Sequence, residues 1–167
     1  MKKQKGLPAV ASAEAGQTLI EIMLAFSVSI LVLSAVVVGV TTSLSNTQHT
    51  KNQNLANFYA QEGMAVVRQI RDSGWPDFSS KTSVNYCLAQ NSTLLSNPPC
   101  GVNVAGIYSR EVEIRHNLQD CSNAGINGSK VAVRVLWSDS KCPLGTPLCH
   151  KVELISCLSN IDQKQAP

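Results

Sequence analysis

Charged and aromatic residues are scarce in this chain of 167 residues, where they make up 15% and 5%. An average soluble domain has about 25% charged residues. The five arginines are spread along the sequence and the formal net charge is +3, so the chain lacks the clustered basic face with which proteins neutralise nucleic-acid phosphates. We therefore expect no nucleic-acid partner. The length allows one ordinary domain with an appendage and excludes two large domains.

Sequence signatures of catalysis and of cofactor binding are also missing. The chain has no G-x-S-x-G, G-x-x-x-x-G-K or H-E-x-x-H motif. It has no Cys-x-x-Cys pair, which argues against a zinc ribbon or a thioredoxin-like redox site. His49, His116 and His150 fall on separate segments, so we expect their placement to be incidental and His150 to be an exposed strand residue. These absences predict a protein that is not an enzyme and has no catalytic residue, metal or cofactor.

Charge is missing altogether from Ile22 to Leu44, an apolar run of 23 residues. As a helix this run would be about 35 Å long, enough to cross a hydrocarbon core of about 30 Å. Lysines precede it in the first five residues, so the positive-inside rule places the N-terminus in the cytoplasm and the rest of the chain outside. A buried core helix would need a larger domain around it, and a cleaved secretory signal would need a small-residue site after the run. We predict a retained single-pass span.

Glu21 directly precedes the apolar run, where an acid is costly if it is drawn into lipid. An interfacial glutamate that reaches the headgroups is one explanation. The order of a basic leader, Gly16, Gln17-Thr18-Leu19-Ile20-Glu21 and a retained apolar helix, however, resembles the prepilin signal of type IV pilins and pseudopilins. The resemblance implies that residues 1–16 are a leader, that a prepilin peptidase cuts between Gly16 and Gln17, and that the new amino terminus at Gln17 is methylated. Gln17 departs from the phenylalanine that is usual in the family.

The resemblance also implies a role for Glu21 in filament assembly. An unpaired buried carboxylate is costly, and the Gln17 amine of a neighbouring subunit would neutralise it and fix the axial register. The expected function is that of a structural subunit, a minor rather than a major pilin, because the segment from Gln61 to Trp75 also looks like minor pilins and related pseudopilins. Its expected partners are other pilin subunits, the prepilin peptidase, the assembly platform in the cytoplasmic membrane and, before assembly, the lipid bilayer.

Two alternatives to a minor pilin remain open. One is a pseudopilin of a type II secretion system, and the other is a single-pass anchored extracytoplasmic binding module. For a pilin or pseudopilin the expected location is first the inner membrane, with the N-terminus in the cytoplasm, and then an extracytoplasmic filament.

Proline is absent between Gln17 and Trp75, so we predict one helix from about residue 18 to 72. Residues 17–44 would be its hydrophobic segment and residues 45–75 an amphipathic continuation, with a break at residues 46–54 as the alternative. Residues 36–42, rich in β-branched side chains, are the stretch most prone to melt in a filament. Gly74 and Pro76 predict a left-handed cap and the helix end. The apolar stripe of the continuation is predicted at Leu55, Tyr59, Val66 and Ile70, with Phe58 and Met64 nearby.

The sequence period changes after Lys81. Three segments alternate between apolar and polar residues and predict half-buried antiparallel strands, the last two of them joined in a hairpin. They are Ile107–Arg115, Lys130–Trp137 and Leu148–Ser156. Their inward rows need an apolar cover, which the second half of the long helix supplies. The predicted fold is α+β, with a long N-terminal helix packed by its second half on a small antiparallel sheet in residues 76–167, as in pilins.

All six cysteines fall on the predicted exported side of the chain. The even count in that compartment favours disulfides, which can pair in 15 ways. The predicted hairpin suggests one set of pairs, each contributing about 2–4 kcal/mol. The set is Cys142–Cys149 across the strand connection, Cys121–Cys157 at the open end of the hairpin and Cys87–Cys100 in the loop after the helix.

Overall fold

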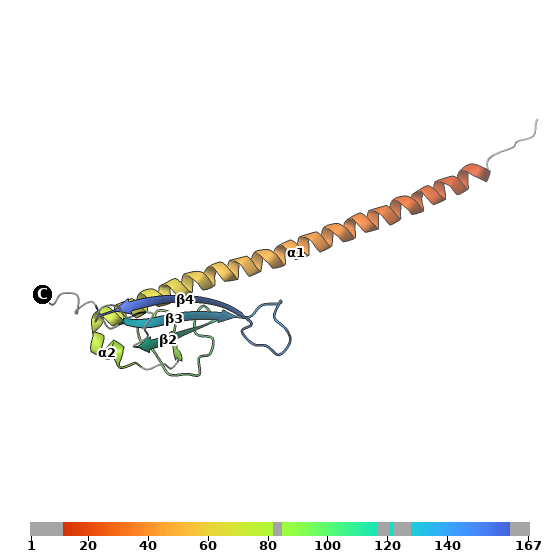
Figure 1. The fold of residues 1–167 in the computed structure, drawn as a ribbon. Coiled ribbons are helices and arrows are strands. Elements are labelled where there is room, and N and C mark those ends of the chain that lie inside the picture. Colours follow the sequence, from red (N-terminus) through yellow and green to blue (C-terminus); the bar gives the residue numbers. More distant parts are fainter. Residues whose placement is uncertain (1–11, 82–84, 117–120, 122–127, 161–167) are drawn as a thin grey trace, which may run out of the picture. The chain divides into compact units, whose positions relative to one another are not determined.

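The computed structural model describes residues 12–81, 85–116, 121 and 128–160, with the side chains of residues 12–17 outside the description. A long helix is followed by a short one and by an antiparallel sheet (Figure 1). The helices are α1 (Ser12–Ser73) and α2 (Trp75–Ser79), and the strands are β1 (Asn85–Cys87), β2 (Tyr108–His116), β3 (Gly128–Trp137) and β4 (His150–Ser159). Residues up to Gln48 and residues from His49 onward form two compact units, which are described separately. The coarse prediction of an α+β chain with one long N-terminal helix is confirmed.

The sheet has four strands in the order β1-β2-β3-β4, and every neighbouring pair is antiparallel. The three strands expected from alternation are present, and the hairpin between β3 and β4 is confirmed. The inward rows of β2 and β3 are buried as predicted, including Val131, Val133 and Val135 on β3 and Val112 and Ile114 on β2, whereas Val152 and Leu154 on β4 are only partly buried. Strand β1 was not predicted, because three residues are too few to show an alternating pattern.

The second part of α1 covers this sheet, but the predicted stripe was centred on the wrong residues. Leu55, Tyr59, Val66 and Ile70 are only partly buried and flank the contact. The fully buried helix positions are Ala56, Ala60 and Val67, each one residue after a predicted position, and Met64, which was expected near the stripe. Small alanine side chains let the helix backbone approach the sheet closely, and the larger residues then seal the two sides. Close approach, rather than side-chain size, selects the buried stripe.

The end of α1 differs from the predicted left-handed glycine cap. Gly74 has φ 169°, which is extended backbone, and it stands as the N-cap of α2. Pro76 lies in the first turn of α2, where a missing N–H costs nothing because that group has no partner within a helix. The chain therefore turns from one helix directly into another. Phe78 of α2 is fully buried and extends the core beyond α1.

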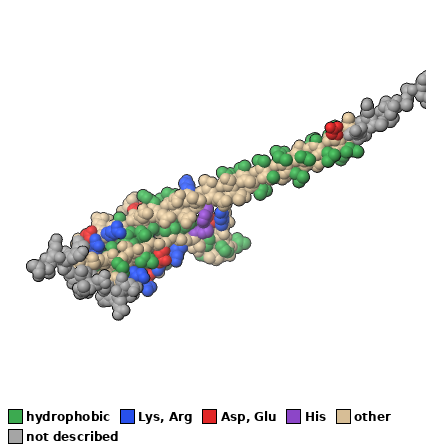
Figure 2. Space-filling model, turned by 45° about the horizontal axis from the view of Figure 1, so that its top comes forward, with side chains coloured by type: hydrophobic (Ala, Val, Ile, Leu, Met, Phe, Trp, Pro, Cys, Tyr) green, Lys and Arg blue, Asp and Glu red, His purple; other side chains and the backbone are tan. Residues whose placement is uncertain are grey.

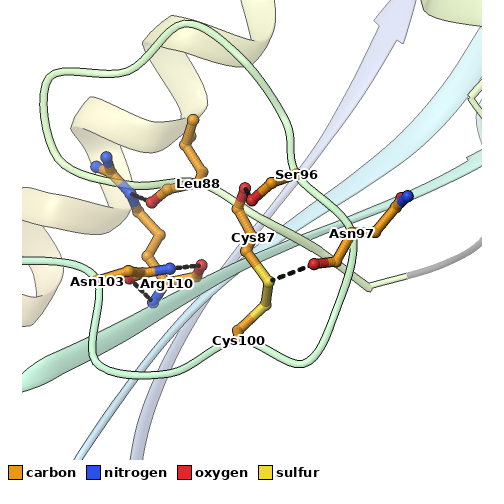
Figure 3. Close-up of a disulfide and its surroundings, with 7 residues drawn as sticks. All are labelled: Cys87, Leu88, Ser96, Asn97, Cys100, Asn103 and Arg110. Carbon is orange, nitrogen blue, oxygen red and sulfur yellow. Dashed lines mark hydrogen bonds between the residues drawn. A yellow bond between two sulfur atoms is a disulfide. The ribbon is translucent and has the colours of Figure 1, made fainter.

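Arg110 is a charged residue on the inward row of β2, and its side chain is fully buried. Its Nε donates to the carbonyl of Leu88 at 3.0 Å, its Nη2 to that of Ala89 at 2.9 Å and its Nη1 to that of Tyr59 in α1 at 3.1 Å. Burial lowers the pKa of Arg110 from its ordinary value, and Glu62, 3.3 Å from Nη1, offsets part of this. One guanidinium thus joins helix, sheet and loop, and Figure 3 shows its hydrogen bond to Leu88.

The structure joins the cysteines as Cys87–Cys100, Cys121–Cys157 and Cys142–Cys149, the set that the hairpin suggested. Figure 3 shows the first of these bridges beside Arg110. Cys87 also exchanges two backbone hydrogen bonds with Ser96, at 2.8 and 3.0 Å. The bridge and this pair of bonds hold the start of the loop whose next two carbonyls accept from Arg110.

The outer face of the sheet carries a network of ion pairs. Glu113, expected on the solvent side, is only 8% exposed because Arg115 and Arg134 cover its carboxylate. Arg134 also pairs with Glu153 at 2.8 Å. Burial raises the pKa of the Glu113 carboxyl, but the hydrogen bonds and charges of the two arginines outweigh it, so the net pKa lies below its ordinary value. Ser109, another polar residue of this alternating segment, is also fully buried, so the polar row of β2 is less exposed than the alternation predicted.

Replacing Gly63 with alanine should destabilise the compact unit. The added Cβ would lie 3.0 Å from Arg110 Cδ and 3.0 Å from Val133 Cγ1, and overpacking of this kind costs about 1–3 kcal/mol. Chemical unfolding of the full chain in detergent, followed by tryptophan fluorescence, measures the loss. Gly39→Ala is the matched control, because a Cβ at Gly39 meets no atom within 4 Å. Equal stability of the two variants would contradict the close approach at Gly63.

Replacing Glu113 with glutamine should make stability less sensitive to acid. Because the folded-state pKa lies below the ordinary value of 4.5, the carboxylate contributes its full stability above that value and loses it as the pH falls through the folded-state pKa. The free energy of unfolding, measured from neutral pH down to about pH 2, should therefore converge for wild type and Glu113→Gln in acid. Asp77→Asn, which alters an exposed carboxyl on α2, is the control and should run parallel to wild type.

Candidate functional site

The first part of α1 presents an apolar surface that nothing in its own unit covers. Its large apolar side chains from Leu19 to Leu44 are between 52% and 71% exposed, and they line the visible side of the helix (Figure 2). They occur at successive positions rather than on one stripe, and a helix that is apolar all round is normally buried or in a membrane. Among the described residues α1 is the one helix long and apolar enough to cross a membrane.

Four hydroxyl side chains within this apolar surface have their hydrogen bonds satisfied inside the helix. Each donates to a main-chain carbonyl three or four residues earlier, at 2.7–3.0 Å. These residues are Ser27, Ser29, Ser34 and Thr41. A satisfied hydroxyl adds little to the cost of placing the helix in hydrocarbon, where free polar groups are expensive. The polar side chains in the run are therefore compatible with a membrane span.

The residues of the prepilin-like motif all fall on α1. Gly16 and Gln17 are helical residues of α1, and the structure describes only their backbone. Glu21 is exposed at the start of the apolar surface. Positions 17 and 21 are four residues apart and so lie on the same side of the helix, one turn from each other. The backbone of residues 36–42 is helical throughout.

A second cluster joins residues that are distant in the sequence. His49 of α1 and His150 at the start of β4 both contact the carboxylate of Asp139, which follows β3. His49 Nδ1 lies 2.9 Å from Asp139 Oδ2, and His150 Nε2 lies 2.9 Å from Asp139 Oδ1. The backbone N–H of Lys141 donates to the same Oδ1 at 2.8 Å. Three donors therefore converge on one carboxylate.

The environment of this cluster keeps Asp139 ionised. Partial burial raises the pKa of its carboxyl, but the hydrogen bonds from His49, His150 and the Lys141 amide outweigh burial and lower it to about 2. The His150 ring stacks on Trp137, with 5.3 Å between the ring centroids. The cluster thus consists of the Asp139 carboxylate between two imidazole rings, one of which stacks on Trp137.

The structure corrects the expectation that the three histidines are unrelated. It brings His49 and His150 together, with ring centroids 4.8 Å apart, and His150 is half-buried rather than exposed. His116 lies elsewhere, between Ser129 Oγ and the carbonyl of Lys81. No local spacing could indicate the cluster, because His49 and Asp139 are 90 residues apart.

Comparison of the chain with protein-family models, with curated proteins and with solved structures gives no match. A functional assignment therefore rests on the residues of the chain itself, and above all on the exposed apolar surface of α1 that follows Glu21.

Proposed function

We propose that the chain is a structural subunit of the type IV pilin kind, a minor pilin-like protein that is inserted in the membrane as a prepilin and joins a filament through α1. The observation that carries this proposal is the apolar surface of residues 19–44, which begins just after Gly16 and Gln17 and has Glu21 near its start. An ordinary anchor would explain the apolar surface alone. It would not explain a small residue and a glutamate at these two distances from the start of the surface.

The free energy available from burying the apolar surface supports a role in assembly. Burial of one large apolar side chain is worth about 1.5–3 kcal/mol, and more than a dozen such side chains are exposed on this part of α1. Lipid covers them before assembly, and helices of other subunits cover them afterwards.

Small residues on the same segment support helix–helix contact. Ala35, Gly39 and Ser43 recur every fourth position, so they share one side of the helix and allow close approach of a second helix, as in membrane helix pairs.

Glu21 supplies the register of the proposed assembly. A carboxylate carried into an apolar filament core is costly unless it is paired. Cleavage after Gly16 creates an amine at Gln17, and the Gln17 amine of a neighbouring subunit is a suitable partner. The pairing forms at only one axial offset between neighbouring subunits. The carboxylate, which is costly to bury unpaired, therefore fixes the axial position of each subunit in the filament.

The compact unit fits an exported location. Its three disulfides need an oxidising compartment, and it begins at His49, just after the apolar surface ends. The proposed membrane segment and the start of the proposed exported unit therefore follow one another directly along α1.

Co-expression with a prepilin peptidase should shorten the chain by residues 1–16. Intact-mass measurement of the purified protein reads the new N-terminus at Gln17, its methylation and the number of disulfides together. Gly16→Leu is the matched variant, which should remain full length because the enlarged residue does not fit the cleavage site. A wild-type chain that still begins at Met1 in the presence of an active peptidase would overturn the proposal in favour of an anchored binding module.

Glu21→Ala should be cleaved normally but should fail to enter filaments, because it removes the charge that pairs with a neighbour. Sheared filaments and membranes are separated, and the chain is quantified in each by immunoblot. Glu14→Ala is the control, since Glu14 leaves with the leader and cannot act in the filament. Incorporation of Glu21→Ala at the level of Glu14→Ala would show that the carboxylate has no role in assembly.

A further inference from the structure

We infer that His49, Asp139 and His150 form a binding site for a divalent transition-metal ion, with Zn²⁺ as the best fit. This inference is independent of the proposed pilin function, because all three residues belong to the compact unit that begins at His49. One ligand atom from each residue lies within 4.8 Å of the other two. Their side chains are 30%, 14% and 22% exposed, so an ion can reach them from solvent.

The donor set selects the kind of metal. Two imidazole nitrogens and one carboxylate oxygen suit Zn²⁺ and its neighbours in the first transition row, whereas Ca²⁺ and Mg²⁺ prefer oxygen ligands alone. Three protein ligands with solvent access leave the fourth tetrahedral position of zinc for a water molecule. A second group, Cys142, Cys149 and His150, is also close enough for metal binding, but its two sulfurs are joined in a disulfide and cannot act as thiolates.

A local rearrangement of the three side chains separates the present geometry from a metal site. Zinc lies about 2.0–2.2 Å from nitrogen and oxygen ligands, which places neighbouring ligand atoms about 3.3 Å apart in a tetrahedron. The two 2.9 Å contacts go to different oxygens of Asp139, and the three ligand atoms lie within 4.8 Å of one another, so the side chains must draw together around one ion. An ionised carboxylate only accepts hydrogen bonds, so His49 Nδ1 and His150 Nε2 now carry protons. To bind a metal, each imidazole must carry its proton on the other ring nitrogen, so the proton has to leave Nδ1 of His49 and Nε2 of His150.

The surroundings hold the three ligands in place before any metal binds. The Lys141 amide fixes the carboxylate of Asp139, and Trp137 stacks on the His150 ring. Trp137 is the cross-strand partner of His150, and the Cys142–Cys149 disulfide closes the connection between Asp139 and His150. Partners of this kind around metal ligands orient them and raise affinity.

Metal at this site would tie α1 to the β3–β4 hairpin. His49 comes from the helix, whereas Asp139 and His150 come from the two ends of the strand connection. Figure 2 shows histidine side chains gathered at one place on the visible surface. A ligand that binds only the folded state stabilises it, so zinc should stabilise this unit.

Zinc titration of the full chain tests the inference. The protein is purified in detergent without a histidine tag, freed of metal with a chelator and titrated with ZnCl₂ by isothermal calorimetry at neutral pH. We expect one Zn²⁺ per chain and a rise in Tm with added zinc. His49→Gln and His150→Gln should each weaken binding by at least about 10–100-fold, the loss seen when even an indirect partner of a metal ligand is removed. CaCl₂ should give no comparable binding.

His116→Gln is the matched control, because His116 contacts Ser129 and Lys81 and not the cluster, and it should keep the wild-type affinity. Binding of zinc by the His49→Gln/His150→Gln double variant at wild-type strength would overturn the inference, as would absence of zinc binding by the wild type. If the variants do not fold, X-ray absorption of the wild type with one zinc decides the question. Two imidazole ligands support the site, and a shell of oxygen or sulfur alone refutes it.

Discussion

The compact unit depends on one buried cation. Arg110 stands on the inward row of β2, and its guanidinium donates to three main-chain carbonyls of α1 and of the loop after β1 and pairs with Glu62. A buried guanidinium is tolerable only when its donors are paired, so the three carbonyls must lie where the fork of the side chain can reach them. This requirement sets the distance between helix and sheet. It also explains why Gly63, one turn after Tyr59, has no side chain where Arg110 Cδ and Val133 pass.

The two parts of α1 differ in which side chains they bury and which they expose. From His49 onward, small residues such as Ala56 and Ala60 are buried against the sheet, and polar residues face solvent. Before Gln48, large apolar residues are exposed at successive positions and hydroxyls bond back to the helix. The first pattern is complete within the chain. The second needs a cover from outside, which is why a function in assembly or anchoring follows from it more directly than a function in catalysis.

Local patterns could be predicted from the sequence, and contacts between distant segments could not. The alternation of Val131, Val133 and Val135 identified β3 and its buried face, and the hairpin then ordered the cysteine pairs. The prediction placed the helix stripe on large residues such as Leu55 and Tyr59 and missed the buried alanines. Apolar periodicity does not show how closely a helix approaches the sheet that it covers. Arg110 sits in an inward row that the alternation already defined, so a charged residue there was a readable signal. The pairing of His49 with Asp139 had no such signal, because it arises only when the hairpin closes beside the helix.

The position of the Cys87–Cys100 bridge has a consequence for when the unit reaches its final form. Leu88 and Ala89, which directly follow Cys87, provide two of the three carbonyls that accept from Arg110. While the thiols are reduced, as they are in the cytosol, no covalent bond holds those two carbonyls in place. Burial of the Arg110 guanidinium then costs more free energy than it does in the disulfide-bonded chain. Oxidation to the Cys87–Cys100 disulfide supplies the missing restraint. With the export proposed above, completion of this core would be coupled to the passage of the unit into an oxidising compartment.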